Sequence, residues 1–123
     1  MAQKRKLRMG MVGGGPGAFI GAVHRMACRL DDKIEVVAGD FSRDPAKSRR
    51  TGRELGLDPA RVYADYRTMI ERESRLPEEK RLDFVSIVTF NDTHFPIACA
   101  ALRAGFHVMC EKPMTIDLKQ AKA

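Results

Sequence analysis

Tryptophan is absent from this sequence of 123 residues, and only 7% of the residues are aromatic. Proteins that bind single-stranded nucleic acid stack the bases on aromatic side chains, so this scarcity argues against a nucleic-acid partner. The apolar stretches are also short, and none approaches the ~18 residues of a membrane span. We therefore expect neither nucleic acid nor a membrane among the partners.

Cysteine is scarce as well, and the three residues lie far apart, at Cys28, Cys99 and Cys110. They form no C-x-x-C pair, and an odd number without a spacing pattern argues against a disulfide scaffold. This usage favours a reducing compartment, so we expect a cytoplasmic protein. The alanine and apolar neighbours of Cys28 and Cys99 indicate small buried side chains on helices. We predict no metal site.

Lysine and arginine exceed the acidic residues by 22 to 16, which gives a net charge of +6. The densest basic cluster lies between residues 43 and 53, where the charges would spread over most of a helix surface. Such a pattern is typical of a solvated face. With 44% hydrophobic and 31% charged residues, the chain has the composition of a globular protein, and its length allows one domain at most.

Strand and helix patterns alternate along the chain. Residues 83–88 are nearly all apolar, which is typical of a strand buried on both faces of a parallel sheet. Apolar residues at Phe19, Val23, Met26 and Leu30 recur at helical spacing. We predict strands at 7–12, 34–39, 62–64, 83–88 and 106–110, and helices at 18–30, 45–55, 66–75, 94–105 and from 118 onward.

Polar residues mark the starts of several of these helices. Asp44, Asp65 and Thr93 are predicted caps, and Asp117 with Gln120 forms a capping box. Alternating strands and helices predict an α/β fold, a Rossmann-type doubly wound parallel sheet with strand order 3-2-1-4-5. Ligands bind such sheets beyond the C-terminal strand ends, where the strand order reverses.

A glycine-rich segment lies between the first strand and the first helix. Its backbone N–H groups and the dipole of the following helix can face a pyrophosphate. Gly13 and Gly15 fit the first two positions of a G-x-G-x-x-G motif, and the third position is either Ala18 or Gly21. We expect an enlarged pyrophosphate loop, in which the candidate residues are Gly13, Gly15, Pro16, Gly17, Ala18 and Gly21.

Asp40 follows the second strand, close to the ~20-residue spacing of the acid that accepts hydrogen bonds from a ribose. The alternative for Asp40 is a turn residue or a helix cap. A carboxylate favours NAD, because it repels the 2′-phosphate of NADP. Ser42 and Arg43 lie close by and could instead hold that phosphate, so NADP stays possible.

Two further segments follow the fourth and fifth strands, namely Thr89-x-Asn91-x-x-His94 and Ala104-Gly105-x-His107-Val108-x-x-Glu111-Lys112-Pro113. Together with the glycine loop and Asp40, they resemble the Gfo/Idh/MocA oxidoreductases. The resemblance covers essentially the whole chain, but only the N-terminal dinucleotide-binding part of a usual member. Glu-Lys-Pro is its most specific element.

The resemblance implies an NAD(P)-dependent dehydrogenase acting on sugars, cyclitols or related hydroxyl and carbonyl compounds. It makes Lys112 the catalytic residue, beside the nicotinamide and the substrate oxygen. It also places the cofactor near Thr89, Asn91, His94 and Glu111. The alternatives are a surface position for Lys112 and turn or capping roles for Asn91 and His94. His24 matches a family histidine, for which we expect a packing role.

Two departures from the family pattern are visible: the stretched glycine loop, and Phe90 where the family usually has proline. We expect residues 1–123 to be the Rossmann domain of a longer two-domain enzyme, truncated before the last strand and before the C-terminal α/β domain. Alone it would be inactive, and its uncovered apolar surface predicts self-association into a homo-oligomer. A non-catalytic NAD(P)-binding regulator is the alternative. An S-adenosylmethionine-dependent methyltransferase leaves Glu111-Lys112-Pro113 unexplained.

Overall fold

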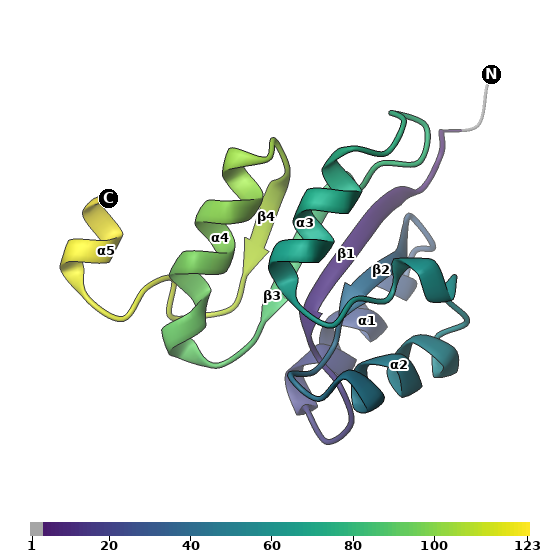
Figure 1. Cartoon of the computed structure of the whole chain (residues 1–123), viewed down its shortest axis with the longest axis horizontal. Coiled ribbons are helices and arrows are strands. Elements are labelled where there is room, and N and C mark those ends of the chain that lie inside the picture. Colours follow the sequence, from purple (N-terminus) through teal and green to yellow (C-terminus); the bar gives the residue numbers. More distant parts are fainter. Residues whose placement is uncertain (1–3) are drawn as a thin grey trace.

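A computed structural model of the chain describes residues 4–123. Four parallel strands form one sheet, in which the order is β2-β1-β3-β4. Figure 1 shows this sheet with its helices and with α5 set apart at the C-terminal end. The strands are β1 (Leu7–Gly13), β2 (Ile34–Asp40), β3 (Phe84–Val88) and β4 (His107–Cys110).

This order confirms the predicted parallel arrangement, with one difference at its outer edge. Residues 62–64, predicted as the third strand, form only an isolated parallel bridge between Val62 and Gly39. A short 3-10 turn, Pro59–Arg61, ends just before Val62, and Asp65 already caps the next helix. Too few residues remain between them for a strand. The bridge still lies beside β2, so the neighbours in the predicted order are right.

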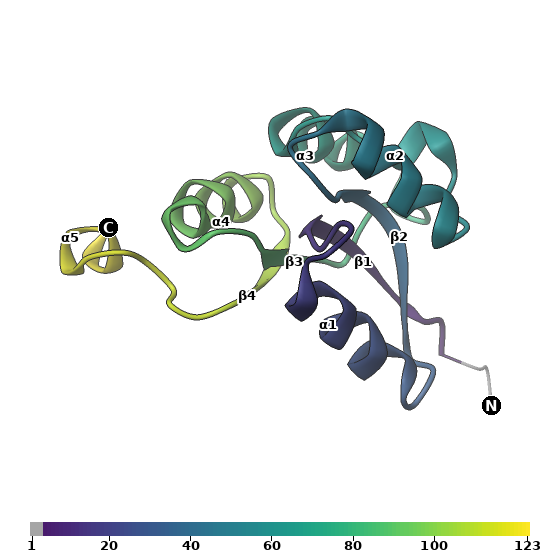
Figure 2. The same cartoon turned by 90° about the horizontal axis from the view of Figure 1, so that it is seen from below.

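Helices cover both faces of the sheet, as in a doubly wound fold. Figure 2 shows α1 on one face, and α3 and α4 on the other. No helix of residues 4–123 is long and apolar enough to cross a membrane. The helices are α1 (Phe19–Arg29), α2 (Pro45–Glu54), α3 (Tyr66–Ser74), α4 (His94–Arg103) and α5 (Leu118–Lys122).

The predicted caps hold at three of the four helices. Asp44 accepts from the Ala46 N–H, and Asp65 from the Thr68 N–H. The Asp117 side chain accepts from the Gln120 N–H. The Gln120 side chain in turn accepts from the Ile116 N–H, whereas a capping box would use the N–H of Asp117 itself. Thr93 occupies the N-cap position of α4 as predicted, but its side chain makes no capping hydrogen bond. Residues Asn91–Thr93 form a 3-10 turn, and the Thr93 hydroxyl bonds back to Thr89 and to the Phe90 carbonyl.

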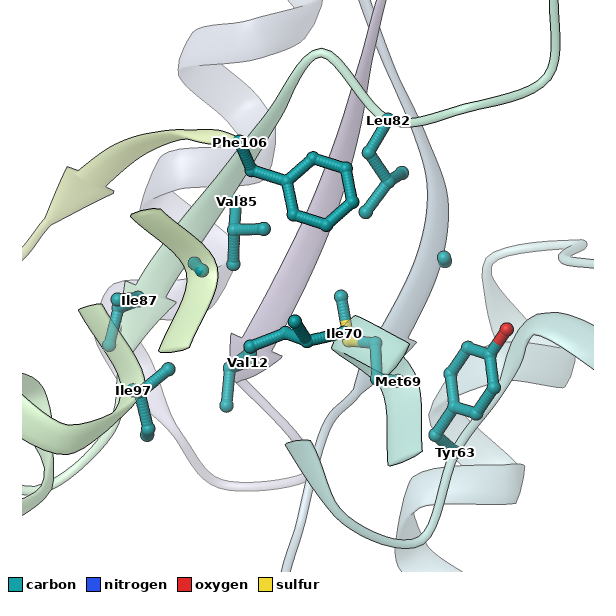
Figure 3. Packing of buried hydrophobic residues seen from close by; sticks show 11 residues of the cluster. Val12, Tyr63, Met69, Ile70, Leu82, Val85, Ile87, Ile97 and Phe106 are labelled. Carbon is teal, nitrogen blue, oxygen red and sulfur yellow. The ribbon is translucent and has the colours of Figure 1, made fainter. Parts of the chain in front are cut away.

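The hydrophobic core has one cluster on each face of the sheet. Figure 3 shows the cluster beneath α3 and α4, where Val12, Val85 and Ile87 of the strands meet Met69 and Phe106, among others. The second cluster lies beneath α1 and contains Met9, Met11, Cys28, Phe41 and Val88. Alternate residues of β1 thus enter opposite clusters, as expected for a strand buried on both faces.

The inward face of α1 differs from the apolar stripe seen in the sequence. Gly21 and Cys28 are its buried residues, whereas Phe19, Met26 and Leu30 are 80%, 60% and 87% exposed. The helix packs close to the sheet through a glycine and through the half-buried Ile20, while these three larger apolar side chains are exposed. Cys28 is buried as predicted, but Cys99 is only half-buried.

Candidate functional site

A cavity of about 550 Å³ lies where β1, β2 and β3 end, at the point where the strand order reverses. Residues of the glycine loop form one side, and Asp40 at the end of β2 forms another with Ser42 and Arg43, which follow it. Thr89, Phe90 and Thr93 contribute the side that follows β3. This is the position at which open α/β sheets bind ligands.

The glycine loop packs its backbone closely against α1. Gly13 and Gly14 have φ of 91° and 80°, values that side chains rarely tolerate. A Cβ at Gly21 would overlap with the Cα of Gly14, so at this point the backbones of the loop and of α1 are in direct contact. Of the two candidates for the third motif glycine, Gly21 therefore has the close-packing position. Gly17 faces open space and borders a second, shallower pocket.

The N-terminus of α1 points its free backbone donors at this loop. The residue that precedes the helix, Ala18, supplies no side-chain cap, and the first turn contains no acidic residue. Arg25 donates from Nη1 to the Gly14 carbonyl at 2.9 Å, so a half-buried guanidinium holds the loop from below. A helix terminus with free N–H groups and a nearby cation favours an anion.

Asp40 is the last residue of β2 and lines the cavity. Its Oδ1 is buried and has no hydrogen-bond partner among the described residues. Burial raises the pKa of this carboxyl to about 6, and the nearby charge of Asp65 adds to the effect. A buried oxygen without a partner costs free energy, unless a ligand hydroxyl donates to it.

Ser42 and Arg43 already have partners within the protein. The Ser42 hydroxyl accepts from the Asp44 N–H at 3.1 Å. The Arg43 guanidinium lies over the Phe90 ring, 5.6 Å from its centroid, a distance suited to a cation–π interaction. Because Arg43 follows β2 and Phe90 follows β3, the pair spans the cavity from one wall to the other.

Glu111 and Lys112 lie outside this cavity, after β4. The Glu111 carboxylate accepts from His24 Nε2 at 3.0 Å, and its other oxygen accepts from the Lys112 backbone N–H at 3.2 Å. The hydrogen bond from His24 lowers the pKa of Glu111. Lys112 is exposed, and its amine makes no ion pair within residues 4–123.

Asn91 and His94 also lie away from the cavity lining. Asn91 is exposed. His94 is 1% exposed, and its ring nitrogens contact the Pro113 carbonyl at 2.7 Å and the Thr89 carbonyl at 3.0 Å. The structure therefore brings the glycine loop, Asp40, Ser42, Arg43 and Thr89 together, and places His94 as a link between two loops.

Several residues of the site lie outside the set that the sequence predicts. Gly14 was passed over because the motif counts only alternate glycines, although its φ makes it as special as Gly13. Tyr66 lines the cavity from the first turn of α3, where it was seen only as a helix start. Arg25 could have been found as a cation four residues after Gly21, on the inward side of α1.

Comparison with known proteins agrees with this architecture. The sequence model of the Gfo/Idh/MocA family, described as an oxidoreductase family with an NAD-binding Rossmann fold, matches residues 7–123. An uncharacterized oxidoreductase, YfiI, from Bacillus subtilis is 40% identical over 111 residues, which are 89% of this chain and 28% of that protein.

Two crystal structures of an inositol dehydrogenase homolog from Azotobacter vinelandii are also similar. One is complexed with NAD+, and the other with NADH and myo-inositol. Both are 47% identical with a TM-score of 0.91 and cover 96% of this chain, which spans 30% and 31% of those chains. The chain thus spans less than a third of the length of these relatives. With its match over residues 7–123 and its glycine loop beside Asp40, it belongs to the Gfo/Idh/MocA oxidoreductase family.

Proposed function

We propose that this chain is the NAD-binding domain of a dehydrogenase that acts on a cyclitol, a sugar or a related hydroxyl or carbonyl compound. The observation that carries the proposal is the buried, partnerless Oδ1 of Asp40 in a cavity beside the glycine loop. A ribose hydroxyl would satisfy this oxygen. The complexes of the Azotobacter vinelandii homolog with NAD+, and with NADH and myo-inositol, support the cofactor and the substrate class.

The residues present fit a dinucleotide in several respects. The backbone donors before α1 suit the pyrophosphate, with Gly13, Gly15, Pro16, Gly17 and Ala18 in the loop and Gly21 packed beneath it. A Cβ at Gly15 would lie 2.5 Å from the Phe41 carbonyl, so only glycine leaves this approach open. Asp40 would hold the adenosine ribose. When bound, NAD supplies the hydride acceptor or donor at its nicotinamide.

Lys112 has the catalytic role in this proposal, by donating a hydrogen bond to the substrate oxygen while charge shifts on it. Its exposed amine, which makes no ion pair within residues 4–123, supports that role. Thr89, just after β3, borders the cofactor. Asn91, His94 and Glu111 act near the nicotinamide end, His94 and Glu111 by shaping the loops rather than by lining the cavity.

NAD is the preferred cofactor in this proposal. The Asp40 carboxylate would repel a 2′-phosphate. Of the residues that could hold that phosphate, Arg43 already lies over the Phe90 ring, and the Ser42 hydroxyl accepts from the Asp44 N–H.

The test is a fluorescence titration of the chain with NADH and NADPH, beside the Asp40→Asn variant. We expect NADH to bind more tightly than NADPH, and Asp40→Asn to weaken NADH binding by about ten-fold or more, the cost of leaving a ribose contact unmade. Asp31→Asn, on the exposed turn after α1, is the matched control and should bind as the unsubstituted chain does. Tighter binding of NADPH would contradict the preference, and failure to bind either would contradict the function.

The organisation of the whole protein belongs to the same proposal. We infer that residues 1–123 act as the cofactor domain of a two-domain enzyme, because the chain spans less than a third of its relatives' length. A homo-oligomer is supported by the exposed apolar side chains of α1. A cytoplasmic location is supported by three cysteines that are all free thiols.

A further inference from the structure

Two histidines hold the segment Glu111–Pro113, one from each face of the sheet. His24 lies on α1 and contacts Glu111, whereas His94 begins α4 and contacts Pro113. Figure 2 shows these helices on opposite faces, with β4 between them. Lys112 is the residue between the two contacts.

The contacts of His24 determine which of its ring nitrogens carries a hydrogen. Nδ1 lies 3.1 Å from the Ser86 hydroxyl, which is completely buried in β3 and makes no other side-chain hydrogen bond within the described chain. If that hydroxyl donates to Nδ1, every group is satisfied, and Nε2–H donates to Glu111. The opposite arrangement would leave the hydroxyl hydrogen without an acceptor in the core. Ser86 therefore orients His24, and His24 orients Glu111.

The effect reaches Lys112 through the second Glu111 oxygen. This oxygen accepts from the Lys112 N–H, so the carboxylate joins the histidine to the lysine backbone. On the other side, the His94 ring lies between two carbonyl oxygens, 2.7 Å from that of Pro113 and 3.0 Å from that of Thr89. An imidazole with a single N–H donates to one of them, and the shorter contact assigns this hydrogen to Nδ1 and the Pro113 carbonyl. His94 thus ties the lysine segment to the start of α4.

We propose that His24 and His94 are positioning residues for Lys112, acting on the lysine segment from its two sides through Glu111 and Pro113. The inference rests on the proposed function, since a fixed lysine matters only beside a bound nicotinamide. Neither histidine touches the cofactor or the substrate in this role. A hydrogen-bonded frame of this kind holds a functional group in place before the ligand arrives.

The test uses substitutions that keep one ring nitrogen position and remove the other. Asparagine places its amide near the Nδ1 position, and glutamine near the Nε2 position. His24→Gln therefore keeps the donor to Glu111, and His24→Asn removes it. At position 94 the roles are reversed, because the Pro113 contact comes from Nδ1.

The measurement is hydrogen exchange and 15N relaxation of the Lys112 amide by NMR on the whole chain. We expect His24→Asn and His94→Gln to accelerate the exchange of the Lys112 amide by about ten-fold or more. His24→Asn loses the hydrogen bond to the Glu111 carboxylate, and His94→Gln loses the short hydrogen bond to the Pro113 carbonyl. His24→Gln and His94→Asn should stay near the unsubstituted chain. The third histidine, His107, is exposed on β4, so both substitutions there should have no effect.

A general loss of stability cannot produce this crossed pattern, because it would not invert between the two positions. Equal exchange in the two variants at either position would overturn the proposal. So would long-range 1H–15N spectra that place the His24 hydrogen on Nδ1. NADH titration of the unsubstituted chain tests the proposed function separately, since a chain that fails to bind NADH can still show the crossed pattern.

Discussion

Asp40, which we propose binds the ribose, also carries a cost in stability. Its pKa is raised to about 6 by burial, so the folded chain holds this proton more tightly than the unfolded chain does. The unfolded chain binds fewer protons in this interval, and the free energy of unfolding therefore falls as pH rises from about 4 to about 6. The whole pKa shift corresponds to a loss of about 3 kcal/mol in the free energy of unfolding, and the partial exposure of Asp40 reduces the expected loss to about 1–2 kcal/mol.

We predict that Asp40→Asn stabilises the chain at pH 7.5 by about 1–2 kcal/mol, because the neutral amide avoids a buried charge. The advantage should shrink at pH 4.5, where the aspartate is mostly protonated in the folded chain. Urea unfolding followed by circular dichroism at both pH values measures it. An equal difference at the two pH values would show that the charge is not the cause, and Asp31→Asn should change little at either.

Single residues also show why the sequence alone could not supply the whole site. Asp40 was predicted because its place after a strand is visible in the spacing. Glu73, by contrast, looks like a surface residue of a helix, yet it is completely buried and bonds to Arg61 and to the Tyr63 hydroxyl. Its partners are 12 and 10 residues away and follow no local pattern. Such contacts depend on how α3 lies against the preceding turn.

At the scale of secondary structure, α1 depends on a contact between two glycines. Gly21 packs against Gly14, and no side chain fits between them. We predict that Gly21→Ala lowers NADH affinity by about ten-fold or more and stability by about 1–3 kcal/mol, because the added methyl group pushes the loop away from the helix. Titration with NADH and urea unfolding measure the two effects.

Gly17→Ala is the control for this prediction. Nothing lies within 4 Å of a Cβ there, although its φ of 78° still disfavours a side chain. Its stability cost should be about 1 kcal/mol, from backbone strain alone, with a smaller loss of affinity than at Gly21. A larger loss of affinity at Gly17 would mean that the packing of α1 is not what places the loop.

Helices and strands could be predicted from the sequence where the apolar pattern extends over many residues, and less well where it covers only a few. Strand 83–88 and its neighbours are apolar over many residues, so their parallel order followed from the fold class. Residues 62–64 are too few to distinguish a strand from a single bridge. The missing capping bond at Thr93 has a similar cause, since one hydroxyl can cap a helix or close a 3-10 turn, and only the backbone decides.

For the molecule as a whole, the exposed apolar side chains predict self-association. On α1 these are Phe19 and Met26, joined by Leu30 just after its C-terminal end, and on β4, at the edge of the sheet, Met109 is 50% exposed. We predict that the sedimentation coefficient rises with concentration, because apolar surface and an open edge strand favour pairing. Glutamate at both Met26 and Leu30 should reduce the effect.

Leu102→Glu is the control for these substitutions, because Leu102 is as exposed as Met26 (59% against 60%) but lies on α4, at the other face of the sheet. It should leave self-association unchanged. A monomer at every concentration would contradict the prediction. If Leu102→Glu reduced self-association equally, the contact surface would not be specific to α1.

The frame around Lys112 also has a consequence for synthesis on the ribosome. His24 and Glu111 are 87 residues apart, so their contact joins an early segment of the chain to a late one. A nascent chain that has released β1, α1 and β2 already contains the glycine loop and Asp40. The lysine and its second anchor, Pro113, emerge much later. The order of translation therefore separates the two proposed halves of the site in time: the segment proposed to hold the ribose is synthesised well before the segment that carries Lys112.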